Sequence, residues 1–150
     1  MDMLAPEGNV YQAGTNSGNP IAVAAGLATL RELQESQPFP VLEERGKQLE
    51  QGLLEAGKQA GVAVGVNRVG SMFWLFFAQG EVKDVATAVQ VDRRLYAGFF
   101  HAMLKRGVYF PPSALEASFV SSAHTEEDVE MTLDAARASL LEVSQTCKGY

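Results

Sequence analysis

A run of six large apolar residues, Met72 to Phe77 (MFWLFF), is the feature that most constrains how this chain can fold. Aromatic residues favour strands, so a dense run of this kind is suited to the centre of a sheet. The run follows Gly70, and before it Val62, Val64 and Val66 alternate as in a half-buried strand. The middle of the chain is therefore predicted to hold two strands.

Segments with helical periodicity flank these strands, over residues 20–35, 41–60 and 91–106 and from Thr125 onward. Asn19-Pro20 suits a helix start, because Asn can cap a helix and proline is tolerated at the first helical position. Gly61 suits a helix stop, and Asp128 follows Thr125 at the spacing of a capping box. Residues 79–90 are ambiguous.

Two further short strands are predicted over residues 108–110 and 117–121. The order is then helix, helix, strand, strand, helix, strand, strand, helix. This order predicts an α+β fold with a small, mostly antiparallel sheet and helices on one face. The first helix is unusual, because its small residues leave it apolar almost all round: Ala22, Ala24, Ala25, Gly26 and Ala28. Such a helix requires close contact on several sides, more than one small sheet supplies.

The composition excludes several classes of protein. The chain has 150 residues, about one domain's length, with 47% apolar and 20% charged residues, as in an ordinary globular protein. Its net charge of −6 and the lack of a basic cluster argue against nucleic-acid binding. The longest apolar stretch, residues 21–30, is too short to cross a membrane. With no signal peptide and a single cysteine, Cys147, the chain is predicted to be cytoplasmic.

The loop GTNSGNP, residues 14–20, leads directly into the first helix. Helix N-termini present unpaired N–H groups that suit phosphate or carboxylate, and Thr15 and Ser17 can donate hydroxyl hydrogen bonds. Gly14 and Gly18 allow close backbone approach. From the residues alone, an anion site and a simple capped helix with a polar turn remain open. No metal site is predicted, because His101 and His124 lie far apart without a ligand cluster.

Three stretches, in this order, resemble the C-terminal part of the glutamate-1-semialdehyde 2,1-aminomutase family, which are pyridoxal-phosphate enzymes of the class III aminotransferases. They are VYQAGTNSGNPIAVAAGLATL, GSMFWLFF and FFHAMLKRGVYFPPSALEASFVSSAHTEEDVE. The resemblance covers essentially the whole chain. It implies a homodimer of fold type I, in which residues 1–36 are an interface loop and linking helix at the end of the large cofactor domain. Residues 37–150 would then form the C-terminal small domain.

The resemblance also implies a reaction and a set of site residues. The family converts glutamate-1-semialdehyde, an amino-acid substrate, into 5-aminolevulinate, a tetrapyrrole precursor. In this family the threonine of the GT-x-SGNP motif, here Thr15, reaches the partner subunit's cofactor phosphate. Gly14 and Ser17 are implied to support it. Glu116 matches a family glutamate near the active site, where it influences the substrate's amino groups or the cofactor lysine. Ser113 and Ser118 are weaker candidates.

The chain departs from the family pattern at Asn16, where an apolar residue is common, and at Ala114-Leu115, where an aromatic residue is usual. It also has only five lysines, Lys47, Lys58, Lys83, Lys105 and Lys148, and none follows a buried strand in a glycine-rich turn. Because pyridoxal-phosphate catalysis requires a Schiff-base lysine, the isolated chain is predicted to be inactive.

Two alternatives to the aminomutase remain at this stage. The chain could be part of another class III aminotransferase with a different amino donor. It could also be a free-standing, non-catalytic α+β module that dimerises or binds a partner. Formation of 5-aminolevulinate separates the first alternative from the aminomutase, and titration with pyridoxal phosphate separates the second.

Overall fold

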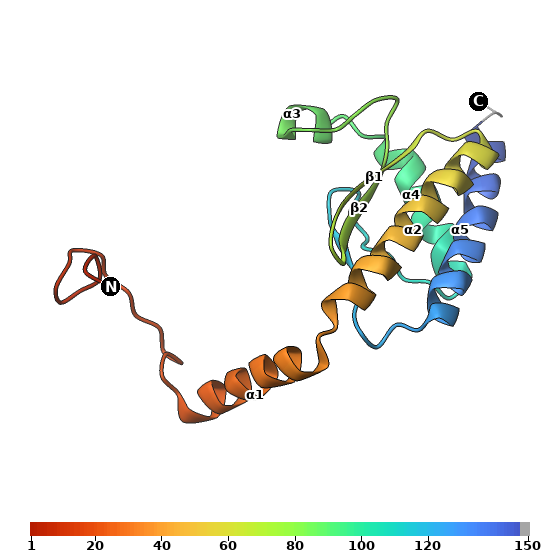
Figure 1. Cartoon of the computed structure of the whole chain (residues 1–150). Coiled ribbons are helices and arrows are strands. Elements are labelled where there is room, and N and C mark those ends of the chain that lie inside the picture. The colour runs from red at the N-terminus through yellow and green to blue at the C-terminus, as the bar shows by residue number, and fades with distance from the viewer. Residues whose placement is uncertain (148–150) are drawn as a thin grey trace. The chain divides into compact units, whose positions relative to one another are not determined.

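A computed structural model describes residues 1–147 of the chain, with side chains through Gln145. The Cys147 side chain and Lys148, both considered above, lie outside the described residues. The chain divides into two compact units, Met1–Gln37 and Pro38–Tyr150. Figure 1 shows both units along the chain. The assignment of residues 1–36 to the end of a larger cofactor domain stays a prediction.

The first unit consists of a small N-terminal loop, an extended segment and helix α1 (Pro20–Ser36). Two backbone hydrogen bonds close the loop, from Ala5 N–H to Val10 O at 3.0 Å and from Val10 N–H to Met3 O at 2.9 Å. The predicted helix over 20–35 is confirmed. It ends at Ser36, and the C-cap residue Gln37 adopts a left-handed conformation (φ 44°) before Pro38, a residue that disfavours helix at the position preceding it.

The second unit contains six named elements beyond its first helix. Helix α2 (Phe39–Ala60) leads to strands β1 (Val64–Val69) and β2 (Met72–Phe77), the short helix α3 (Val85–Ala88) and helix α4 (Arg93–Lys105), then β3 (Ser118–Phe119) and α5 (Glu126–Cys147). The three strands form one antiparallel sheet in the order β1-β2-β3. The predicted α+β fold with a small antiparallel sheet is confirmed.

The core of this unit lies between one face of the sheet and the helices. Phe73, Leu75 and Phe77 alternate along β2 and are all buried. The ring of Phe99 on α4 packs edge to face against Phe77, with centroids 5.7 Å apart. Helices α2 and α5 contact each other over much of their length and run side by side in Figure 1. The aromatic run therefore forms the central strand, as predicted.

Helix α2 approaches β1 closely at a glycine. A Cβ atom at Gly57 would lie 2.7 Å from the Cβ of Val64, a β-branched side chain with little freedom to move away. Gly61 then ends the helix in a left-handed conformation (φ 68°), as predicted. The glycine inside the helix lowers helix propensity but permits this close helix–sheet contact.

The structure corrects two predicted strands. Residues 108–110 form no strand, because Phe110 turns into the core and the following Pro111-Pro112 has no N–H groups for a sheet ladder. The strand predicted over 117–121 is reduced to Ser118–Phe119, which pairs with Phe73 and Met72. The ambiguous residues 79–90 contain α3, which begins at an Asp84 capping box.

The last helix begins as predicted. Thr125 N–H donates to the Asp128 carboxylate at 2.6 Å, and Asp128 N–H donates to the Thr125 hydroxyl at 3.1 Å. These hydrogen bonds lower the pKa of Asp128, most strongly through the Thr125 backbone. Within residues 1–147, none of the helices has the length and hydropathy that crossing a bilayer would require.

Candidate functional site

The Gly14–Gly18 segment forms a tight polar turn. Ser17 N–H donates to Gly14 O at 2.9 Å, and Asn19 N–H donates to Asn16 O at 3.1 Å. Gly18 takes a positive φ of 73°, which only glycine adopts freely. These contacts hold Gly14, Thr15 and Ser17 together in one short turn, and all three residues are exposed.

The helix end next to this turn is already capped. The Asn19 side chain accepts hydrogen bonds from Ile21 N–H at 3.0 Å and from Ala22 N–H at 3.2 Å, and Pro20 has no N–H. The N–H groups at the start of α1, which were candidates for an anion site, are therefore largely paired with the Asn19 side chain. Donors for an anion come instead from the turn.

Those donors suit the phosphate end of a cofactor. Among the described residues, the hydroxyl groups of Thr15 and Ser17 have no hydrogen-bond partner, and neither do the backbone N–H groups of Thr15, Asn16 and Gly18. A cluster of hydroxyl and backbone N–H donors is the chemistry that a phosphate dianion requires. The turn contributes one set of donors and no basic side chain, so it fits part of a phosphate site.

Glu116 belongs to the second unit, at the end of the segment 111–116. Two side chains donate to backbone carbonyls of this segment: the Tyr96 hydroxyl to Pro111 O at 2.7 Å and Trp74 Nε1 to Ala114 O at 2.8 Å. Glu116 N–H donates to Ser113 O at 3.2 Å, which forms a turn. The Glu116 side chain is exposed, so its carboxylate is available to a ligand.

A cleft of about 430 Å³ lies beside this segment. Apolar side chains form much of its wall, and Glu116 is one of its few charged groups. Its lining includes the apolar residues Leu49, Phe73, Phe110, Val120 and Val129 and the acidic residues Glu116 and Asp128. The other carboxylate in the lining, Asp128, accepts hydrogen bonds from Thr125, whereas Glu116 is exposed. A cleft with mainly apolar walls and a carboxylate of this kind can receive a small molecule with an amino group.

The weaker candidates have local roles. The Ser113 hydroxyl accepts a hydrogen bond from Leu115 N–H at 3.3 Å, and Ser118 pairs with Phe73 in the sheet. His124 Nδ1 accepts a hydrogen bond from Ser121 N–H at 3.1 Å, which ties down the approach to α5. Within the part of the chain that the structure describes, no three His, Cys, Asp or Glu residues gather in a metal-binding cluster.

The four described lysines are all exposed, namely Lys47, Lys58, Lys83 and Lys105. Lys83 forms an ion pair with Glu81, and Lys105 lies 3.9 Å from Glu142. A Schiff-base lysine requires a desolvated pocket that lowers its pKa. None of these four lysines, on the surface of the described chain, has that environment.

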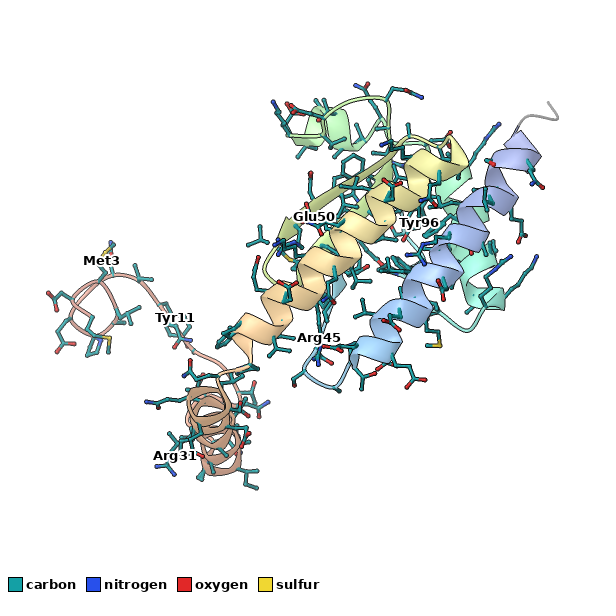
Figure 2. All side chains as sticks on the ribbon, turned by 45° about the vertical axis from the view of Figure 1, so that its right-hand side comes forward. Met3, Tyr11, Arg31, Arg45, Glu50 and Tyr96 are labelled. Carbon is teal, nitrogen blue, oxygen red and sulfur yellow. The ribbon has the colours of Figure 1, made fainter. Side chains whose placement is uncertain are left out.

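Sequence reasoning missed a partly buried charge cluster at the sheet, in which the Arg68 side chain is 13% exposed. Arg68, at an inward position of β1, forms ion pairs with Glu50 at 2.7 Å and Glu43 at 2.8 Å on α2, and donates to Gly70 O at 2.9 Å. The hydrogen bond to Glu50 and then that to Glu43 raise the pKa of Arg68. Glu50 projects from α2 in Figure 2. An arginine inside a half-buried strand was the signal that such partners exist.

Solved structures that this chain resembles include an aminotransferase and a second pyridoxal-phosphate protein. The chain matches a β-phenylalanine aminotransferase from Variovorax paradoxus with a TM-score of 0.76 and 28% identity, covering 87% of this chain and 30% of that one. It matches the pyridoxal-phosphate internal aldimine form of a Sphingopyxis sp. protein with a TM-score of 0.75 and 26% identity, covering 93% of this chain and 31% of that one. No family model matches the sequence.

Sequence relatives agree with this likeness and are more specific. The chain is 50% identical over 140 residues to a glutamate-1-semialdehyde 2,1-aminomutase of Akkermansia muciniphila, covering 93% of this chain and 33% of the relative. It is 52% identical over 141 residues to the aminomutase of Thermus thermophilus, with the same coverage. The chain thus spans about a third of the length of these relatives. It is therefore related in sequence to the glutamate-1-semialdehyde 2,1-aminomutases and corresponds to a C-terminal portion of these enzymes.

Proposed function

We propose that this chain serves as the C-terminal portion of a pyridoxal-phosphate-dependent aminomutase that converts glutamate-1-semialdehyde into 5-aminolevulinate, a step toward tetrapyrroles. The observation that carries the proposal is identity of 50–52% to named aminomutases over 93% of the chain. Because the chain spans about a third of those relatives, the activity belongs to the whole enzyme.

The Gly14–Gly18 turn would hold the phosphate of pyridoxal phosphate in the partner subunit of a homodimer. The Thr15 hydroxyl donates to a phosphate oxygen, and Gly14 and Ser17 shape the turn and add donors. When bound, the cofactor supplies an aldehyde that carries the amino group between neighbouring carbons. The turn's part is to orient that cofactor through its phosphate.

Glu116 would act as an accessory catalytic residue at the mouth of the cleft. A carboxylate at this place accepts hydrogen bonds from an ammonium group and stabilises its positive charge. The amino groups of the substrate are the groups that such a carboxylate would recognise. Glu116 is then expected to affect turnover more than cofactor affinity.

The isolated chain would be inactive, because none of its described lysines lies in a site suited to a Schiff base. Its partners would be the second subunit and a small amino-acid substrate, with no nucleic acid or membrane. The enzyme would act in the cytoplasm. A net charge of −6 without a basic cluster supports the exclusion of nucleic acid.

A chimeric enzyme tests this function. The matching third of the Thermus thermophilus aminomutase, 52% identical to this chain, is replaced by the chain itself. The chimera is expected to form 5-aminolevulinate from glutamate-1-semialdehyde, measured by a colorimetric assay for the product. A chimera that is dimeric and loaded with pyridoxal phosphate, yet forms no 5-aminolevulinate, contradicts the proposal.

The same chimera tests the role of Thr15. Loss of one hydrogen bond to a charged group costs about 1.5–3 kcal/mol, so Thr15→Ala is expected to raise the Kd for pyridoxal phosphate roughly tenfold to a hundredfold. The matched control is Thr29→Ala, which removes an exposed hydroxyl that donates to Ala25 O within α1. Equal cofactor affinities of the two variants would exclude Thr15 from the phosphate site.

A further inference from the structure

Two side chains from different elements donate hydrogen bonds to the backbone of segment 111–116. Tyr96 projects from α4 and donates to Pro111 O, and Trp74 projects from β2 and donates to Ala114 O. The two carbonyls stand at the start of the segment and two residues before Glu116. Two hydrogen bonds at different positions along a short segment restrict its path more than either hydrogen bond alone.

Both donors contact neighbouring aromatic rings. The Tyr96 side chain is 3% exposed and its ring packs edge to face on Phe77, with centroids 6.3 Å apart. The Trp74 indole contacts the ring of Phe76 in a tilted arrangement, with centroids 4.7 Å apart. Tyr96 is therefore held in the core, and Trp74 is packed against it. Figure 2 labels Tyr96 inside the second unit.

The segment itself offers few other attachments. Pro111 and Pro112 have no N–H groups, so their backbone can be held only through carbonyl oxygens or through side-chain packing. Ala114 is buried at 8% exposure, where an unpaired carbonyl would be costly. The two side-chain donors are thus the polar contacts that decide where the segment lies.

We propose that Tyr96 and Trp74 are positioning residues that fix the segment 111–116 and thereby place Glu116 in the lining of the cleft. The expected effect on catalysis rests on the proposed function of Glu116. The positioning of segment 111–116 rests only on the two hydrogen bonds. Neither residue has to touch substrate or cofactor to act in this way.

The hold is tested on this chain by nuclear magnetic resonance. Trp74 is the only tryptophan, so the ¹⁵N-labelled protein shows a single indole N–H signal. Tyr96→Phe removes only the hydroxyl and is expected to speed exchange of that indole proton with water about tenfold or more, because the freed segment opens. Ser144→Ala is the matched control, since it removes a buried hydroxyl that donates to Leu141 O at 2.9 Å. An exchange rate in Tyr96→Phe equal to that of the control overturns the proposal.

The link to Glu116 is tested by a double-mutant cycle in the chimeric aminomutase. Tyr96→Phe and Trp74→Phe are each expected to lower kcat/KM about tenfold with glutamate-1-semialdehyde. In a Glu116→Gln background the same changes are expected to have less than a twofold effect, because there is no longer a carboxylate to place. A merely structural role would lower activity equally in both backgrounds, and that result overturns the proposal.

The two experiments separate this proposal from the proposed function. If the function is wrong, the chimera without further substitutions makes no 5-aminolevulinate. The indole exchange experiment on the isolated chain still tests the positioning role in that case. If the positioning role is wrong, the chimera is active but the indole exchange or the double-mutant cycle gives the contrary outcome. The folding of each purified variant is checked by circular dichroism, so that a misfolded variant is recognised.

Discussion

Helices α1 and α2 follow one another in the chain but differ sharply in what they bury. Helix α1 has apolar residues almost all round, yet none of its residues, all of which the structure describes, is buried. Helix α2 carries many charged residues and buries six positions along one side. Apolar composition alone therefore does not decide burial. A helix is buried when its apolar side meets a complementary surface, and only α2 has one within its own unit.

The apolar surface of α1 is extensive. Ile21 is 81% exposed and Leu30 is 66% exposed. Figure 2 looks nearly along this helix and shows its side chains, Arg31 among them, projecting all round. Large exposed apolar patches are a feature of interaction sites. The proposed homodimer of a larger enzyme would supply the surfaces that cover it.

The largest expected contrast between the two helices concerns buried leucines. Leu53 of α2 is fully buried, so Leu53→Ala is expected to lower the free energy of unfolding of the second unit by about 2–5 kcal/mol. Leu30→Ala in α1 is expected to change it by less than about 0.5 kcal/mol. Urea denaturation of this chain measures both variants. Similar losses in the two variants would show that α1 is packed against the core in solution.

A pH experiment tests Tyr96, a buried residue of the second unit, for which the exposed first unit has no counterpart. Burial raises the pKa of Tyr96 to about 12, and the negative charge of Glu116 adds to the shift. The ordinary pKa is about 10, so the unfolded chain loses this proton first as the pH rises. The stabilising effect is complete below pH 10 and is lost as the pH approaches 12.

From two pKa units, this loss amounts to about 2–3 kcal/mol. It is measured as the difference between the wild-type chain and Tyr96→Phe in urea denaturation across pH 9–12. Because the Glu116 charge contributes, Glu116→Gln is expected to lower the pKa of Tyr96 in an ultraviolet titration. If the stabilities of wild type and Tyr96→Phe change in parallel from pH 9 to 12, the raised pKa of Tyr96 is refuted.

The two helices also offer a matched pair of glycines. Gly57→Ala in α2 places a Cβ against Val64 and is expected to destabilise the second unit by roughly 1–3 kcal/mol, despite alanine's better helix propensity. At Gly26 in α1, the added Cβ meets no atom within 4 Å apart from its chain neighbours and the helix's own backbone. Gly26→Ala is therefore expected to raise helicity without destabilising anything. Thermal unfolding followed by circular dichroism distinguishes the two, and a destabilised Gly26→Ala would reveal a neighbour for α1.

The smallest expected effect concerns the cap of α1. Asn19→Ala removes a side chain that accepts two backbone N–H groups, which costs the helix about 1 kcal/mol. The chemical shifts of α1 are expected to move toward coil values while the unfolding midpoint of the second unit stays the same. A lowered midpoint would mean that the two units unfold together.

Much of the fold could be predicted because its signals are local. Asn19-Pro20, Gly61 and the Thr125–Asp128 box mark helix ends within a few residues, and the structure places helix boundaries there. The aromatic run of β2 identified the central strand in the same way. Of the site, the Gly14–Gly18 turn was visible as a sequence motif, and its role at a phosphate stays a prediction.

The rest depended on contacts between residues distant in the chain. Residues 108–110 have the composition of a strand, but Phe110 packs between Phe73 and Phe99, at centroid distances of 6.2 and 5.6 Å, and the chain turns away. A local contact decided the other case, because the Asn19 side chain accepts hydrogen bonds from the Ile21 and Ala22 N–H groups that were candidates for an anion. Tertiary contacts decided in the first case, and the identity of one capping side chain in the second.

By itself the sequence determined where helices begin and end, which strand is central and which enzymes the chain resembles, because caps, periodicity and shared motifs can be recognised along a short stretch. Only the tertiary structure decided the path of segment 111–116. That path depends on Tyr96 and Trp74, which lie 15 and 40 residues away from their acceptors along the chain. Hydrogen bonds over such separations leave no local pattern, since they exist only once the core has brought the two segments together.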